Sequence, residues 1–332
     1  GCAADACDVI AAGDNIALQN VVATNPRDPS VVLFDGTDQI GATRAIAVTR
    51  AGWPTNPGTL LAGAVEVYPI GTWGTSYELP VGVDTPTSNF EYTAASIMAA
   101  ANGTTVTIDV DADTIVDQTH VLGAGESVLV GGLDESATIT ATGPIQVDLL
   151  TGDVGATYAG RWFALLPTSQ WATSYFNPVG TSGADGPSYA VLYNPGTATL
   201  TVDVDYQGGA TTVDVAPGDV ATYTMPASGA RFSAGSAFYA TVIVDYDDTA
   251  SDWGFTLVPE TRLTTAAVVG WGPGSNDPPT ENSSPVWVTA EGATTLYVDY
   301  DGDPTTGPNV DTNGDQYDVA LPVVAYQMER LY

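Results

Sequence analysis

A strand-like segment that occurs three times constrains the fold of this chain more than any other feature. The copies read GTTVTIDVD at Gly103–Asp111, GTATLTVDVD at Gly196–Asp205 and GATTLYVDYD at Gly292–Asp301. Each begins with a turn glycine and then alternates Val, Leu, Ile or Tyr with Thr or Asp, which is the pattern of a half-buried β-strand. Recurrence at nearly equal intervals predicts β modules of roughly a hundred residues each.

A second repeat supports the same module length. Trp73–Gly82 reads WGTSYELPVG and Trp171–Gly180 reads WATSYFNPVG, each after a short lead-in strand, and a weaker copy occurs at Trp253–Pro259. The chain therefore has about seven short strands per module, separated by turn residues. This pattern predicts an all-β fold of tandem β-sandwich (Ig-like) modules, two of them complete and one split between the chain termini.

The repeats divide the chain into five parts. We expect a flexible or tethered N-terminal arm (1–14), an N-terminal β segment (15–63), β-sandwich module 1 (64–160), β-sandwich module 2 (161–252), and an incomplete module 3 with an Asp-rich loop (253–332). Each complete module is expected to close with two short strands, at Ala137–Thr142 and Ile145–Leu150 in module 1, and at Ala230–Ser233 and Phe238–Tyr246 in module 2. Module 3 lacks equivalents of these closing strands.

A segment near the other end of the chain resembles the missing strands. Ile40–Trp53 (IGATRAIAVTRAGW) resembles a closing strand that has no module before it. An open β module exposes unpaired strand edges, which favour association by strand addition. The two halves could close within one chain, or one chain could complete the next and so generate a filament. The residues expected at this contact are Ile40, Ala45, Ile46, Val48, Trp53, Leu296, Val298, Val319 and Leu321.

The charge balance argues against several classes of partner. The chain has 7 Lys and Arg residues, all of them Arg, against 39 Asp and Glu residues, and its net charge is −32. Such a surface repels the phosphates of nucleic acids and of anionic lipids. The acidity has three interpretations: life in high salt, Ca²⁺ loading of the Asp-rich loops, or a solvated surface without a specific ligand. No apolar run reaches the roughly 20 residues of a membrane span.

The strongest ligand signal is the Asp-rich loop of module 3. Its oxygen-bearing side chains alternate around turn glycines, a pattern that suits Ca²⁺ although the spacing departs from that of an EF-hand. Solvated turn acids are the competing interpretation. The candidate ligands are Asp299, Asp301, Asp303, Asp311, Asn313, Asp315 and Asp318. The acids at the equivalent places in modules 1 and 2 are expected on the polar faces of strands; they are Asp109, Asp111, Asp203 and Asp205.

No residue pattern supports a catalytic site. His120 is the only histidine, and it is expected as a surface or turn residue because no nucleophile or partner motif accompanies it. Four tryptophans could form a carbohydrate-binding platform, but their fixed places in the repeat favour core or inter-module packing. These are Trp73, Trp162, Trp171 and Trp253.

The two cysteines favour an oxidising, extracytoplasmic setting. Cys2 and Cys7 could form a disulfide with each other or with another chain, and Cys2 could carry a lipid. The chain starts at Gly1, as a processed or a trimmed chain would. Asn102 and Asn282 begin N-glycosylation sequons, which matter only in an organism that glycosylates.

Four consecutive segments carry a resemblance to a known family. NGTTVTIDV, LGAGESVLV, ATITATGPIQVDLLTG and RWFALLPTSQWATSYFNPVG occur in the order of the IgGFc-binding-protein N-terminal-like repeats of bacterial extracellular and surface proteins. The chain resembles these repeats over residues 64–260. The resemblance implies an extracellular, β-rich, adhesive or structural protein without a shared catalytic site. Immunoglobulin binding does not carry over, because no motif here is specific for it.

The leading hypothesis is a secreted structural protein, not an enzyme, whose copies join head-to-tail into a cell-surface filament, sheath or layer. Its main partner would then be further copies of itself, and its expected cofactor is Ca²⁺. The alternative is a monomeric surface adhesin that binds host-surface or matrix glycans or proteins. A secreted hydrolase is a more distant alternative.

Overall fold

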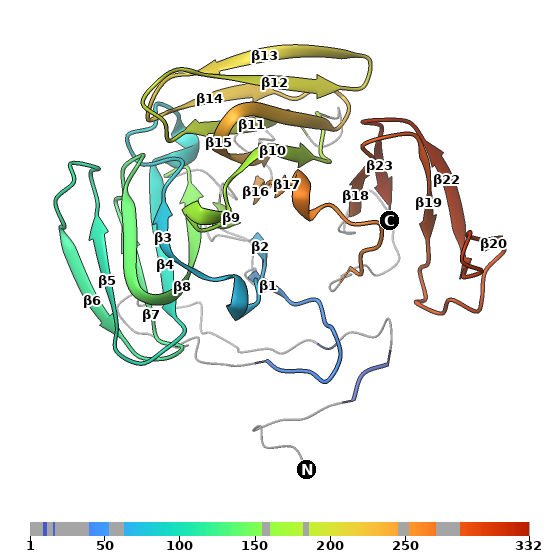
Figure 1. Ribbon diagram of the computed structural model, residues 1–332, viewed down its shortest axis with the longest axis horizontal. Helices are drawn as coiled ribbons and strands as arrows, with labels where there is room; N and C mark the ends of the chain where they lie inside the picture. The colour runs from blue at the N-terminus through green and yellow to red at the C-terminus, as the bar shows by residue number, and fades with distance from the viewer. Residues whose placement is uncertain are drawn as a thin grey trace.

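The computed structural model describes residues 9–11, 16, 40–52, 63–154, 160–181, 186–244, 252–269 and 286–331. Over these residues the protein is all-β, as predicted, and its helical segments are short 3-10 turns. Figure 1 shows three groups of strands along an arc, with module 1 in teal and green, module 2 in yellow and module 3 in red. The hairpin of β1 (Thr49–Gly52) and β2 (Gly63–Glu66) lies near the centre of this view.

Module 1 contains two sheets that share one long bent strand, β8 (Thr138–Gly152). The first half of β8 pairs with β5 (Thr104–Asp109) and β3 (Gly74–Glu78). The second half pairs with β4 (Tyr92–Ala99) and β9 (Gly160–Ala164). The outer strands are β6 (Gln118–Leu122), which pairs with β5, and β7 (Ser127–Gly131), which pairs with β4. The two sheets therefore form a sandwich that β8 holds together.

Module 2 repeats this arrangement around β15 (Ala230–Val244). The first half of β15 pairs with β12 (Leu200–Tyr206) and β10 (Ala172–Asn177), and the second half pairs with β11 (Ser188–Asn194) and β16 (Trp253–Thr256). The outer strands are β13 (Gly209–Val215), which pairs with β12, β14 (Asp219–Thr224), which pairs with β11, and β17 (Val258–Pro259), which pairs with β10.

The two short closing strands expected in each module are one continuous strand. Gly143 and Pro144 lie between the two expected strands, and at this point the strand bends and its pairing passes from one sheet to the other. Ile139 and Ile145 lie on the two sides of this bend, and both are fully buried. Burial of both halves against different sheets outweighs the local turn preference of the sequence.

Among its described residues, module 3 contains the counterparts of β4, β5, β6 and β7 of module 1. β18 (Val286–Thr289) pairs with β23 (Met328–Leu331), and β19 (Thr294–Val298) pairs with β22 (Val319–Val323). The short hairpin β20 (Asn309–Val310) and β21 (Gln316–Tyr317) lies in the Asp-rich loop. Within residues 286–331, no long strand joins the two sheets.

Three proline-led turns connect the modules in the same way. η1 (Ile70–Thr72), η3 (Thr168–Gln170) and η4 (Glu260–Arg262) each follow a proline in nearly the same backbone conformation. The side-chain amide of Gln170 donates to the backbone carbonyl of Thr72, and the guanidinium of Arg262 donates to the side-chain oxygen Oε1 of Gln170. The linkers thus form a column, which gives successive modules a repeated offset. A fourth turn, η2 (Ser88–Phe90), lies inside module 1.

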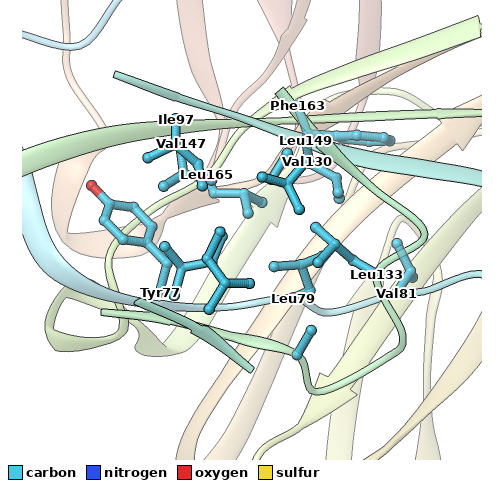
Figure 2. Packing of buried hydrophobic residues seen from close by; sticks show 14 of the residues in the cluster. Tyr77, Leu79, Val81, Ile97, Val130, Leu133, Val147, Leu149, Phe163 and Leu165 are labelled. Carbon is cyan, nitrogen blue, oxygen red and sulfur yellow. The ribbon is translucent and has the colours of Figure 1, made fainter. Parts of the chain in front are cut away.

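The core of module 1 continues into module 2. Figure 2 shows its centre, where Tyr77 and Leu79 face Val147 and Leu149. The same cluster includes residues from the outer face of β11 and β15, namely Val191, Tyr193, Tyr239 and Ile243. Trp171 joins them, with its ring 5.0 Å from Tyr239 and 5.9 Å from Tyr193. These contacts support the predicted packing role of the repeated tryptophan.

Module 3 packs on module 2 at the equivalent place. The carbonyl of Tyr326 accepts from the backbone N–H of Gly229 at 3.0 Å, and its ring stacks on Phe176 at 5.7 Å. In the first junction, the equivalent carbonyl of Gly218 accepts from the hydroxyl of Ser136 at 3.4 Å. The hydroxyl of Thr289 adds a bond to the carbonyl of Pro178. Both junctions therefore use the same surfaces of the module.

A buried tyrosine ties β3 of module 1 and β10 of module 2 to the long strand of its module. The hydroxyl of Tyr175 donates to the carbonyl of Phe238 at 2.8 Å and accepts from the N–H of Ala172 at 2.9 Å. Tyr77 makes the same pair of bonds in module 1, to Ile145 and Gly74.

We expect Tyr175→Phe to lower the unfolding free energy by about 1–3 kcal/mol, because a buried carbonyl and a partly buried N–H group lose their partner. Chemical denaturation measures this change. The control is Tyr92→Phe, since Tyr92 is 39% exposed. An equal and small effect of both substitutions would contradict the structural role of Tyr175.

The first junction also holds a carboxyl group with an unusual pKa. Glu135 accepts from the hydroxyl of Thr85 at 2.8 Å and lies near Asp84 and Asp219. Burial raises the pKa of Glu135 to about 7; the bond from Thr85 opposes this rise, while the charges of Asp219 and Asp84 add to it. The folded state therefore favours the protonated form of Glu135.

Because its pKa is raised in the folded state, Glu135 contributes stability that is fully present at pH values below 4.5, its ordinary pKa. This contribution is lost as the pH rises through about 7. We expect Glu135→Gln to raise the melting temperature at pH 8 and to flatten its dependence on pH between 5 and 8. Glu291→Gln, on an exposed side chain, is the control for the general loss of one acid. Unchanged pH dependence in Glu135→Gln would show that Glu135 titrates normally.

Candidate functional site

The open side of module 3 is the candidate site. In modules 1 and 2, β4 and β11 each have a strand on both edges, as do β5 and β12. Their equivalents β18 and β19 have a partner on one edge only among the described residues. The partner that both strands lack among the described residues is the long bent strand. We call this missing place the gap of module 3.

Backbone hydrogen bonds establish which residues are equivalent in the second sheet. Tyr326 N–H donates to the carbonyl of Ala290 just as Gly125 N–H donates to Ala99. Tyr326 even has the positive φ of that glycine, 60° against 76°. Val288 therefore occupies the place of Ile97 in module 1.

A side-chain bond establishes the equivalence in the first sheet. Tyr300 N–H donates to Asp318 at 2.9 Å, as Val110 N–H donates to Asp117 at 2.8 Å. Val298 therefore occupies the place of Ile108. By the same spacing along the strand, Leu296 occupies the place of Val106.

Apolar side chains at these equivalent places differ in exposure. Ile97, Val106 and Ile108 are fully buried in module 1. Their counterparts Val288, Leu296 and Val298 are only partly buried. The difference follows from the gap, since the long strand covers these positions in the complete modules. The open side of module 3 is thus an apolar surface between two unpaired strand edges.

The N-terminal hairpin also has, within the part of the chain that the structure describes, an unpaired strand edge on β1. Val67 N–H donates to the carbonyl of Val48 at 3.0 Å, and Leu165 N–H donates to Val147 at the same distance. β1 is therefore the counterpart of the second half of β8, and β2 is the counterpart of β9. Among the described residues, β1 pairs with β2 alone, so the edge that meets β4 in module 1 is open.

Residues before β1 match the buried positions of the long strand but are exposed. Ile40 and Ile46 have the same spacing as Ile139 and Ile145. They precede Val48 by the same numbers of residues by which Ile139 and Ile145 precede Val147. Ile40 is 54% exposed and Ile46 is 43% exposed, whereas both counterparts are 0% exposed. Two large apolar side chains thus stand in water at positions that the complete modules bury.

The hairpin is held by module 1. The guanidinium of Arg50 lies 3.8 Å from the carboxylate of Asp148 and 5.4 Å from the ring centre of Trp162. β2 contacts β9, which in turn contacts β16. The lead-in strands of successive modules therefore stack side by side, and the hairpin takes the first place in this stack.

The other predicted contact residues have mixed positions. Ala45 is exposed and lies outside any strand, and Trp53 lies outside the described residues. Val319 and Leu321 lie on β22, opposite Val298 and Leu296. Because β22 occupies the closed edge of β19, these two residues flank the candidate site instead of forming its open edge.

The Asp-rich loop brings together three of its seven candidate ligands. Asp299, Asp301 and Asp318 have carboxylate oxygens within 4.8 Å of one another. Asp303 and Asp311 instead accept hydrogen bonds within turns of their own, from Thr305 and from Asn313. The described cluster is therefore smaller than the predicted set, which also included Asp315.

A second cluster lies at the equivalent place of module 1. Asp109, Asp111 and Asp117 also have carboxylate oxygens within 4.8 Å of one another. We expected Asp109 and Asp111 on a polar strand face, and we missed Asp117 because it lies across a loop. In module 2 a tight turn between β12 and β13 replaces this loop, and no such cluster forms among its described residues.

Other residues singled out in the sequence have ordinary surroundings or lie elsewhere. His120 lies on β6 rather than in a turn, near the side chain of Gln118. Asn102 accepts from the N–H of Ala124. Cys2, Cys7 and Asn282 lie outside the described residues. No helix among the described residues is long and apolar enough to cross a membrane.

Comparison with known protein families matches part of the chain. Residues 53–160 match a family model described as IgGFc binding protein. This confirms the expected resemblance for the hairpin strand β2 and module 1. The match indicates an extracellular binding or surface protein. No curated protein and no solved structure matches the chain.

Ca²⁺ binding remains a prediction, and its expected ligands are now the three clustered acids Asp299, Asp301 and Asp318. We expect Ca²⁺ at 100 times its dissociation constant to stabilise module 3 by about 2.7 kcal/mol, and a chelator to reverse this. Asp299→Asn should remove one bound ion, measured by calorimetry. Asp303→Asn is the matched control, because Asp303 belongs to the same loop but not to the cluster. An unchanged melting temperature with and without chelator would remove the prediction.

Proposed function

We propose that this chain, with its match to an extracellular binding family, is a secreted structural protein whose copies join head-to-tail at the cell surface. In this assembly the N-terminal segment of one copy completes module 3 of the next, and the product is a filament, sheath or layer. The observation that carries the proposal is the complementary pair of defects. Module 3 has two open strand edges among its described residues, and the N-terminal strand β1 has one open edge of its own.

The position of the hairpin favours closure between copies over closure within one copy. Arg50 and β2 hold the hairpin against module 1, in the same stack that β9 and β16 continue. Closing module 3 of the same chain would require the hairpin to leave this place. A second copy can bring its own hairpin, with module 1 attached, to the open side of module 3.

Assembly of this kind is open-ended. The contact joins two different surfaces of the molecule, so each added copy presents a new open module. The acidic surface fits this role, because strong net charge keeps such copies apart except where an apolar contact overcomes the repulsion.

The family match favours a second candidate function, which is protein binding by module 1. The two functions are compatible, since a filament can display a binding module at every repeat. The ligand of such a module would be an extracellular protein or glycan.

Ile46→Asp tests the assembly. Ile46 contributes a buried apolar side chain to the composite module, so an aspartate there should weaken association by at least about 100-fold. The wild-type chain should form extended polymers by negative-stain microscopy and sedimentation, whereas Ile46→Asp should remain monomeric with an unchanged circular dichroism spectrum.

Ile115→Asp is the matched control, because Ile115 is an exposed isoleucine (64%) in the loop between β5 and β6, outside β1, β18 and β19. It should assemble like the wild type. A wild-type chain that stays monomeric at every concentration would refute the proposed assembly, and so would polymers formed by Ile46→Asp.

A further inference from the structure

We propose that residues 40–52 of a second copy enter module 3 as one bent strand, in the register that β8 and β15 use in the complete modules. This inference rests on the proposed function and adds the pairing of individual residues. It makes Ile40 and Ile46 the residues that select the register.

The second sheet defines the first part of the register. Val147 pairs with Ile97 in module 1, and Ala240 pairs with Leu192 in module 2. The counterpart of Val147 is Val48, and the counterpart of Ile97 is Val288. Val48 of one copy therefore lies opposite Val288 of the next, with β1 antiparallel to β18.

The first sheet defines the second part. Ile139 pairs with Ile108 in module 1, and Phe232 pairs with Val204 in module 2. The corresponding pair places Ile40 of one copy opposite Val298 of the next. The residues of both pairs in modules 1 and 2 are fully buried. Ile40 would therefore be buried in the core of the completed module 3.

The bend between the two halves has the required length. Five residues separate Ile139 from Ile145, and five separate Ile40 from Ile46. Thr43 stands at the place of Thr142, whose hydroxyl accepts from the N–H of Thr105 at 2.9 Å. Thr295 is the residue of module 3 that would make this bond to Thr43.

One charged residue lies on the inward face of the incoming strand, and its own chain supplies its partner. Arg50 stands at the place of Leu149, which is fully buried. The carboxylate of Asp148 lies 3.8 Å from Arg50 on the module that arrives with it. The charge therefore enters the composite module already paired, which lowers the cost of burying it.

Alternation along the strand makes the register specific. A slip by one residue would turn Ile40, Ile46 and Val48 to the outer face and would bring smaller or polar neighbours such as Gly41, Ala47 and Thr49 into the core. A slip by two residues would keep the faces but would separate the bend from the boundary between the sheets.

Disulfide trapping between two single-cysteine variants tests the register. In a background of Cys2→Ser and Cys7→Ser, Ala47→Cys is mixed with Thr289→Cys for the second sheet, and Gly41→Cys with Tyr297→Cys for the first. Gly41 tolerates this change, because a Cβ there meets no atom within 4 Å. Both mixtures should give a dimer on a non-reducing gel.

Gly41→Cys mixed with Thr295→Cys is the control for a two-residue slip, because diagonal neighbours are too far apart for a disulfide. It should give no dimer. Dimers from the slipped pair alone, or from one sheet alone, would overturn the register even if polymers form. A chain carrying both Ala47→Cys and Thr289→Cys should give a ladder of polymers, and a monomer closed on itself would overturn both the register between copies and the proposed function.

Discussion

One long bent strand per module holds this structure together. β8 and β15 each pair with four other strands and belong to both sheets of their sandwich. Their apolar side chains on both sides of the bend are fully buried, so each strand closes a core that the neighbouring strands cannot close alone. A module without this strand has two open sheet edges and a half-exposed core. Module 3 has this form over its described residues.

The junctions between modules depend on the same strand. The outer face of β15 presents Tyr239 and Ile243 to the core of module 1. The long strand of module 2 therefore covers part of the core of module 1. The column of linker turns and the stack of lead-in strands repeat with the same step. Strand closure and module stacking are therefore coupled, which explains how a contact between copies could reproduce a contact within one copy.

The sequence predicted the all-β fold and its repeated strand pattern, because these depend on strand periodicity and on recurrence. It did not predict that the closing strands are continuous, since Gly143 and Pro144 have local turn preferences that burial of the two halves overrides. The contact between copies stays a prediction, and the structure adds that Ile40 and Ile46 are exposed and that Val298 is partly buried. Val319 and Leu321 lie on the paired edge of β19, because the choice between the two edges of this strand depends on pairing that no local pattern reveals. Asp117 was missed for a similar reason, since a loop brings it to Asp109.

The central claim is that a strand from another copy fills the gap in module 3. Hydrogen exchange of the backbone amides in β18 and β19 tests this claim most directly, because every second amide of these strands points toward the gap and not toward β23 or β22. As the chain assembles, they should become as protected as the amides of β4 and β5, where the long strand is present. Exchange in β18 and β19 that stays fast in the assembled material would contradict the account.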